Sequence, residues 1–177
     1  MSRQGWEECV ISVAADGVAV ANTTTETIVF PNIKIPFSSF AVGKTFKLKA
    51  YGKLSTTGTP TIIFAIRAGG VAGTLIATTE AITNGSGVTN VNWEIEVTIV
   101  CRAIGSSGSL LVMGTAKVHT AAGTVVVNIF GVSGWDAPAP VTVDLTADVD
   151  LALTADWSAA SASNTLTGLI ETFEEMN

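Results

Sequence analysis

The feature that most constrains this chain is a hydrophobic pattern that repeats every second residue along much of its length. In residues 91–101 apolar side chains occupy alternate positions with polar ones between them, and residues 45–51 alternate in the same way. The longest alternating run spans residues 141–155. Because successive side chains of a strand point to opposite faces of a sheet, this pattern predicts antiparallel strands with one buried and one wet face.

Turn-forming segments rich in Gly, Ser, Thr and Asn separate these runs, and no stretch has a convincing helical period. The chain of 177 residues has the length of one domain. Together these features predict an all-β fold, an antiparallel β-sandwich of jelly-roll type, with residues 41–177 as the sandwich domain. The small polar residues at 158–165 are expected to form the turn of a last hairpin.

Residues 1–40 are interpreted separately, as an extended N-terminal arm or as edge strands. Pro31 and Pro36 interrupt the strand-like patches in this segment. One interpretation is an edge strand that folds onto the same sandwich, and the other is an arm that reaches a neighbouring subunit. The aromatic side chains that could anchor such an arm at an assembly interface are Trp6, Phe30, Phe37 and Phe40.

The chain carries little charge for a soluble protein. Only 14% of its residues are Asp, Glu, Lys or Arg, and its formal net charge is −6. A surface so poor in charge favours contact with other chains, so we expect an oligomer or a larger assembly. The absence of a basic stripe argues against direct nucleic-acid binding, and the absence of a long apolar run argues against a membrane span. Glu7 and Glu8 interrupt any N-terminal apolar segment, which argues against a secretory signal peptide.

The residues that could do chemistry are few and isolated, and we expect no catalytic residue, no cofactor and no metal site. His119 is the only histidine, so it is the only candidate for a nucleophile–histidine pair. Cys9 and Cys101 are interpreted as free thiols, with a disulfide left open. Asp148 and Asp150 would point the same way about 7 Å apart on a strand, which indicates a solvated acidic face rather than a calcium site.

Three segments resemble virion structural proteins of tailed bacteriophages. These segments are "IPFSSFAVGKTFKLKAYGKLSTTGTPTIIFAIRAGGVAGTLIATT", "NWEIEVTIVCRAIGSSGSLLVMG" and "LALTADWSAASASNTLT". The similarity covers about residues 35–168 and leaves most of the N-terminal segment outside. The resemblance implies a non-enzymatic jelly-roll protein of the particle, a homotrimer that contacts its own subunits and the major capsid protein or other virion proteins. Such a protein is made in the host cytoplasm and resides in the virion.

Two functions are compatible with this resemblance. The first is a capsid decoration, or cement, protein that binds and stabilises the phage head. The alternative is a tail or fibre component that binds a glycan or receptor, in which an exposed Trp135 or Tyr51 would stack on a sugar ring. Trp93 and Trp157 fall on the buried phase of their strands, so they are expected to pack in the core.

Overall fold

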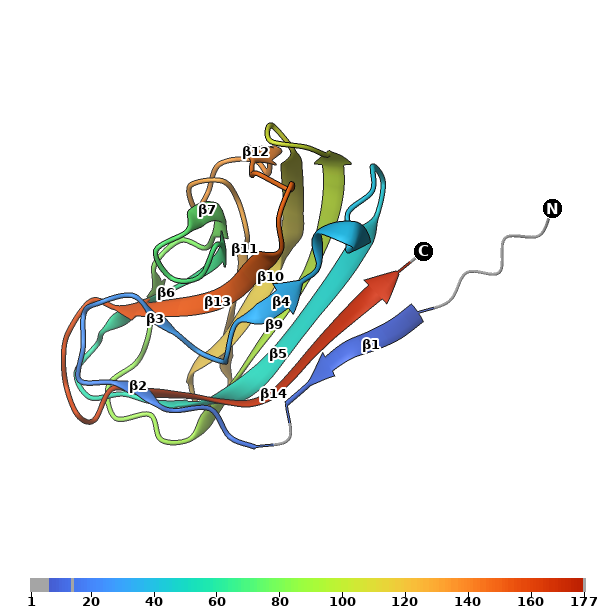
Figure 1. Ribbon diagram of the computed structural model, residues 1–177. Helices are drawn as coiled ribbons and strands as arrows, with labels where there is room; N and C mark the ends of the chain where they lie inside the picture. The colour runs from blue at the N-terminus through green and yellow to red at the C-terminus, as the bar shows by residue number, and fades with distance from the viewer. Residues whose placement is uncertain (1–6, 14, 177) are drawn as a thin grey trace.

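The computed structural model describes the backbone of residues 7–13 and 15–176, which form two antiparallel β-sheets packed face to face (Figure 1). Apart from one 3-10 turn, η1 (Phe37–Ser39), the described residues form only strands and the loops between them. The prediction of an all-β, antiparallel sandwich is therefore confirmed. In the described part of the chain, no helix has the length and hydrophobicity that crossing a membrane requires.

The larger sheet has eight strands, with β1 and β11 at its two edges. Its main path runs in the order β1, β14, β5, β9, β10 and β11, while β2 adds to β14 and β12 adds to β10. The strands are β1 (Glu7–Ser12), β2 (Val20–Ala21), β5 (Thr45–Ser55), β9 (Val91–Ala103), β10 (Ser109–Ala121), β11 (Thr124–Ile129), β12 (Val141–Thr142) and β14 (Thr165–Met176).

The smaller sheet has six strands and covers the inner face of the larger one. Its main path runs in the order β3, β13, β6 and β7, while β4 adds to β13 and β8 adds to β6. The strands are β3 (Thr27–Ile28), β4 (Ile33–Ile35), β6 (Thr61–Ala68), β7 (Thr74–Thr78), β8 (Ile82–Thr83) and β13 (Val149–Trp157).

The connectivity is nested from the two ends of the chain inward. The first and last strands, β1 and β14, pair in the larger sheet, and the next strands inward, β3 and β4 from one side and β13 from the other, pair in the smaller sheet. This wrapping of paired strands around a sandwich is the topology of a jelly roll. The hairpin of β10 and β11 widens the larger sheet beyond β9.

The hydrophobic core lies between the sheets, where the alternating apolar residues of both sheets meet. Phe64 of β6 and Trp93 of β9 join the two layers, with ring centroids 5.6 Å apart. Gly52 stands opposite Trp93, and a Cβ atom at this glycine would lie 2.5 Å from the indole ring and 2.1 Å from the Thr167 carbonyl oxygen. The glycine therefore makes room for the indole. Trp93 and Trp157 are both buried, as their phase predicts.

Two local expectations are wrong, for the same reason. The alternating run at 141–155 is not one strand, because β12 ends at Thr142 in the larger sheet and β13 begins at Val149 in the smaller sheet. Likewise, the polar residues at 158–164 do not close a hairpin, since β13 and β14 belong to different sheets. In both places the chain crosses between the layers, which local alternation does not reveal.

Residues 20–40 fold along the sandwich of their own chain. β2 pairs with β14, and β3 and β4 pair with β13. Phe30 is buried against β14, where a Cβ atom at Gly168 would lie 2.3 Å from its ring. This packing explains why a glycine stands at that point of the strand.

Candidate assembly and binding surfaces

The structure separates the aromatic residues that the sequence suggests for an assembly interface. Phe30 and Phe40 are buried in the core of their own chain, and Phe40 packs edge-on against Phe46 with ring centroids 5.8 Å apart. Phe37 is 58% exposed. Trp6 lies outside the described residues. Among the described residues of the set, Phe37 alone presents its ring to solvent.

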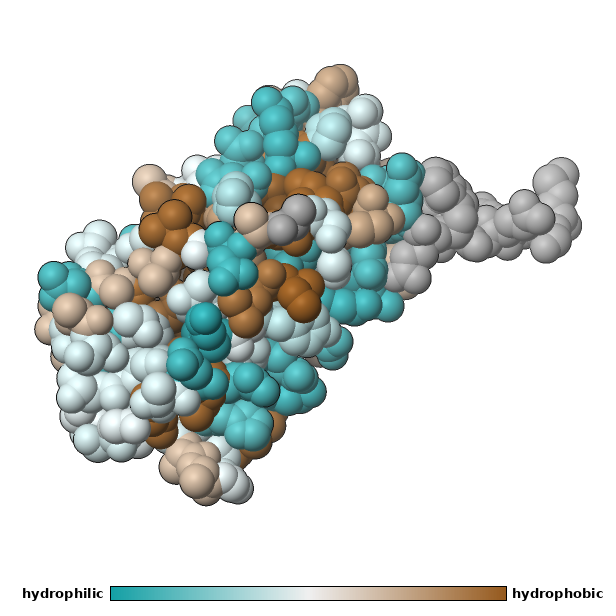
Figure 2. All heavy atoms as spheres, turned by 90° about the horizontal axis from the view of Figure 1, so that it is seen from below, coloured by the Kyte–Doolittle hydropathy of each residue, from teal (hydrophilic) through white to brown (hydrophobic). Residues whose placement is uncertain are grey.

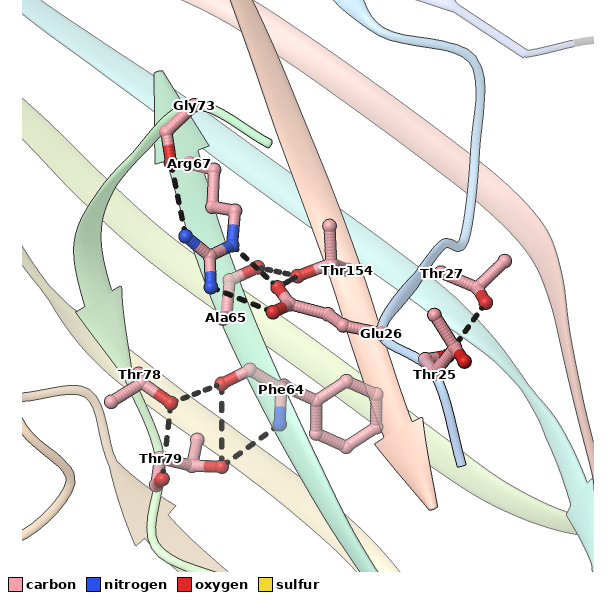
Figure 3. Close-up of polar contacts among 10 residues, drawn as sticks. All are labelled: Thr25, Glu26, Thr27, Phe64, Ala65, Arg67, Gly73, Thr78, Thr79 and Thr154. Atoms are coloured by element: carbon pink, nitrogen blue, oxygen red, sulfur yellow. Dashed lines mark hydrogen bonds and ion pairs between the residues drawn. The ribbon is translucent and has the colours of Figure 1, made fainter. Parts of the chain in front are cut away.

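An ion pair fastens the segment before β3 to the smaller sheet (Figure 3). Arg67 of β6 holds the Glu26 carboxylate with two hydrogen bonds, from Nε at 2.6 Å and from Nη2 at 2.7 Å. The Thr154 hydroxyl of β13 also donates to this carboxylate, and Arg67 Nη1 donates to the Gly73 carbonyl at 3.0 Å. Arg67 holds the pKa of Glu26 below its ordinary value. The contacts therefore join three separate parts of the chain.

Three exposed apolar side chains come from the segments before β5 and after β9, at one end of the sandwich. Phe37, Val42 and Ile104 define this apolar tip, and all three are exposed. The Gly43 N–H donates to the Cys101 carbonyl at 2.8 Å, which joins the turn before β5 to the end of β9. The Phe37 N–H donates to Asp148 Oδ1 at 3.1 Å, and the neighbouring Phe40 is anchored in the core. The backbone thus holds the exposed ring in a defined place.

A second apolar surface lies along the edge strand β11. Val125, Val127 and Ile129 point outward from this strand and are 45%, 55% and 61% exposed. Met113 of β10 is exposed on the same face of the sheet. Figure 2 shows, on one face of the molecule, hydrophobic residues in separate patches between pale and hydrophilic ones. Apolar surface is thus distributed over several parts of the molecule.

A groove of about 500 Å³ crosses the outer face of the larger sheet. Ile170 of β14 and Val125 of β11 line it, together with Tyr51, Asn92 and His119. Lys117 and Glu94, which form an ion pair, also line it. The Tyr51 hydroxyl donates to Glu96 Oε1 at 3.4 Å, and burial, followed by the charges of Glu96 and Glu94, raises the pKa of this tyrosine. The single tyrosine and the single histidine of the chain therefore meet in one groove.

The other residues considered for chemistry lie apart from one another. Cys9 is exposed on β1, Cys101 is buried in β9, and both are free thiols. Asp148 is paired with Lys34 at 3.5 Å, while Asp144 accepts hydrogen bonds from the backbone and hydroxyl of Thr146. Within the described ranges, no three His, Cys, Asp or Glu side chains are grouped so that they could hold a metal ion.

One buried acid, Glu171, is not predicted by the alternating pattern. The register of β14 shifts between Gly168 and Ile170, so Ile170 is exposed and Glu171 turns inward. Glu171 is 1% exposed and its Oε2 atom has no hydrogen-bond partner among the described residues. Burial raises the pKa of this carboxyl to about 7. The sequence does contain a signal for this bulge. Leu166 and Phe173 are an odd number of residues apart, so simple alternation cannot bury both of them.

The fold and these surfaces define a β-sandwich protein with exposed apolar side chains at one end and along one edge. No family model matches the chain, and neither the curated proteins nor the solved structures include one with significant similarity to it.

Proposed function

We propose that this chain is a structural protein of a bacteriophage particle, a decoration protein that binds and stabilises the head without catalysing a reaction. It is made in the host cytoplasm and becomes part of the virion, where it contacts its own copies and the major capsid protein. The phage assignment rests on the resemblance of residues 35–168 to virion structural proteins. The trimer implied by that resemblance stays a prediction.

The observation that carries the assembly role is the apolar tip formed by Phe37, Val42 and Ile104. Covering such side chains contributes about 25 cal/mol per Å² of apolar area removed from water, before the costs of association. Phe37 is also held by its backbone hydrogen bond to Asp148, so little ordering of that backbone remains to be done on binding. An exposed aromatic ring on a fixed backbone is the kind of residue that dominates interface energies.

The test is binding of the full chain to heads of the phage whose genome encodes it, measured by co-sedimentation with heads that lack the protein. Phe37→Ser is expected to weaken binding at least tenfold, because it removes the one aromatic ring of the apolar tip. Val18→Ser is the matched control, since Val18 is also exposed but lies near β2, at the other end of the sandwich.

Both variants should keep the circular dichroism spectrum and unfolding midpoint of the parent chain, because neither side chain is in the core. If the parent chain does not sediment with heads, or if Phe37→Ser binds as tightly as Val18→Ser, the apolar tip is not the head-binding surface. Labelling of intact particles with an antiserum would then show whether the chain sits on the tail.

The groove on the larger sheet favours a second candidate function, a tail or fibre module that binds a glycan. Tyr51 offers a ring that could stack on a sugar, while Asn92, His119 and the Lys117–Glu94 pair offer hydrogen-bond donors and acceptors for hydroxyl groups. A glycan array probed with the full chain would test this function. Tyr51→Ala should abolish binding, whereas Trp135→Ala should retain it, because Trp135 is exposed outside the groove.

A further inference from the structure

The edge strand β11 presents a row of main-chain groups that have no partner within the described chain. The Phe130 N–H donates to the Gly114 carbonyl of β10 at 3.0 Å, whereas Gly131 exchanges two hydrogen bonds with Thr78 of β7 on the opposite side. Along an antiparallel strand, the N–H and C=O groups of successive residues point to opposite sides. Because Phe130 points toward β10, the N–H and C=O groups of Val125, Val127 and Ile129 point away from β10, toward the free edge.

This edge lacks the features that normally prevent strands from pairing between molecules. β11 has the sequence TVVVNI, with no charged residue and no proline. Its side chains at Val125, Val127 and Ile129 are exposed and apolar, and its register with β10 is regular over these three residues. A straight, uncharged, β-branched edge is a template for another strand.

The geometry points to a second copy of this chain as the partner, paired antiparallel through β11 about a two-fold axis at Val127. In this register Val127 lies opposite Val127 of the second copy, and Val125 lies opposite Ile129 of the second copy. Each of these pairs exchanges both of its N–H···O hydrogen bonds. The two larger sheets would then form one continuous sheet.

The two ends of the free edge select this register. At Gly131 the edge is already occupied by Thr78 of β7. With the axis at Val127, the residue opposite Gly131 is Gly123 of the second copy, where that copy's chain turns back toward β10 with a positive φ of 72°. The blocked position thus coincides with the end of the incoming strand. Moving the axis to Ile129 would instead place Val127 of the second copy against the occupied Gly131.

The same register is self-complementary in side chains, which a two-fold interface requires. Only β-branched aliphatic residues meet across the axis on the outer face, and pairs of this kind stabilise neighbouring strands. No like charges come together, because Lys117 and His119 lie on β10, one strand further from the axis. The inference rests on the assembly role proposed above and identifies a second copy of the chain as one partner in that assembly. The surface involved is separate from the apolar tip.

The molar mass of the full chain in solution, measured by light scattering and sedimentation over a dilution series, tests the pairing. We expect a dimer, or a hexamer in which β11 joins two trimers. Val127→Lys should raise the dissociation constant at least tenfold, because it places two like charges opposite each other at the axis. Val18→Lys, which adds the same charge at another exposed valine, should leave the mass unchanged.

Amide hydrogen exchange gives a readout that does not depend on a variant. In the associated protein the amides of Val125, Val127 and Ile129 should be protected and should lose protection on dilution, while those of Val126 and Asn128 stay protected by β10. A monomer at all concentrations, a mass that Val127→Lys does not change, or fast exchange at the three alternate amides would overturn the inference. Head binding that persists in a Val127→Lys monomer would leave the proposed function intact.

Discussion

Glu26 and Glu171 are two carboxyl groups that the fold places in opposite surroundings, one partly exposed beside an arginine and one fully buried. Glu26 lies in the segment before β3, and its carboxylate accepts hydrogen bonds from Nε and Nη2 of Arg67. Glu171 lies on the inner face of β14, and its Oε2 atom has no hydrogen-bond partner among the described residues. The partner, rather than burial alone, therefore decides how a carboxyl group affects stability.

The two groups give stability opposite dependences on pH. The pKa of Glu171 is raised from 4.5 to about 7 in the folded protein, so folding favours its protonated form. Its contribution to the free energy of unfolding is fully present below pH 4.5 and is lost as the pH rises through 7. The pKa of Glu26 is lowered by Arg67, so its contribution is present above 4.5 and is lost as the pH falls below that value.

The largest effect is expected from Glu171→Gln, which removes the group that is costly to ionise. At pH 8 the variant should be more stable than the parent by about 3 kcal/mol, the free energy that corresponds to a pKa raised from 4.5 to about 7. At pH 4.5 the two proteins should unfold alike. Urea unfolding at both pH values measures the difference, and an equal difference at pH 4.5 and pH 8 would contradict it.

Glu26→Gln should have the next largest effect, with the opposite sign. At pH 7 it should lower the free energy of unfolding by about 2 kcal/mol, since hydrogen bonds to a charged group typically contribute about 1.5–3 kcal/mol. The effect should shrink as the pH falls below 4.5, because the parent carboxyl then becomes protonated and its pairing with Arg67 is lost. Thermal unfolding across this pH range provides the measurement, and a loss that does not change with pH would point to packing instead.

A smaller effect is expected from Arg67→Lys, which keeps the positive charge but removes the planar pair of donors. We expect a loss of about 1 kcal/mol, because an ammonium group cannot hold the Glu26 carboxylate at two points or reach the Gly73 carbonyl at the same time. Unfolding of this variant beside Glu26→Gln measures it. Equal stability of Arg67→Lys and the parent would show that charge alone holds the segment.

The smallest effect is expected on the pKa of Asp156, an acid that senses the charge of Glu26. Burial, and after it the charge of Glu26, raises the pKa of Asp156 on β13. In the Glu26→Gln variant the pKa of Asp156 should fall toward its ordinary value, because the neighbouring negative charge is gone. Titration of the Asp156 carboxyl carbon by NMR would detect the shift. No change would mean that burial alone accounts for the raised value.

The aromatic residues near the N-terminus show how far a prediction from sequence can go. Their spacing suggested anchors for an arm, but it could not distinguish a ring that packs into its own core from one that faces outward. Phe30 is buried because Gly168, far along the chain, leaves room for it, whereas Phe37 lies in η1, a short turn with no buried residue. A truncation of residues 1–40 would therefore remove part of the core, so the substitution at Phe37 is the cleaner test.

The candidate surfaces were predictable only in part. Low charge favours contact with other chains, which stays a prediction, and the aromatic ring of Tyr51 suggests a sugar-stacking residue. The groove could not be predicted, because Tyr51, His119 and Ile170 come from strands that are adjacent only after the sheet has formed. The free edge of β11 also depends on the order of strands, since β10 pairs with one side of β11 and no described strand pairs with the other side.

The sequence by itself determined that this chain is an antiparallel β-sandwich and which face of most strands is buried. Alternation has a period of two and belongs to each strand alone, so it can be recognised without knowing the partners. The tertiary structure alone decided that the chain crosses between sheets at residues 143–148 and 158–164, that a bulge turns Glu171 inward and that the outer edge of β11 has no strand beside it among the described residues. These features depend on contacts between residues far apart in the chain, which no local pattern encodes.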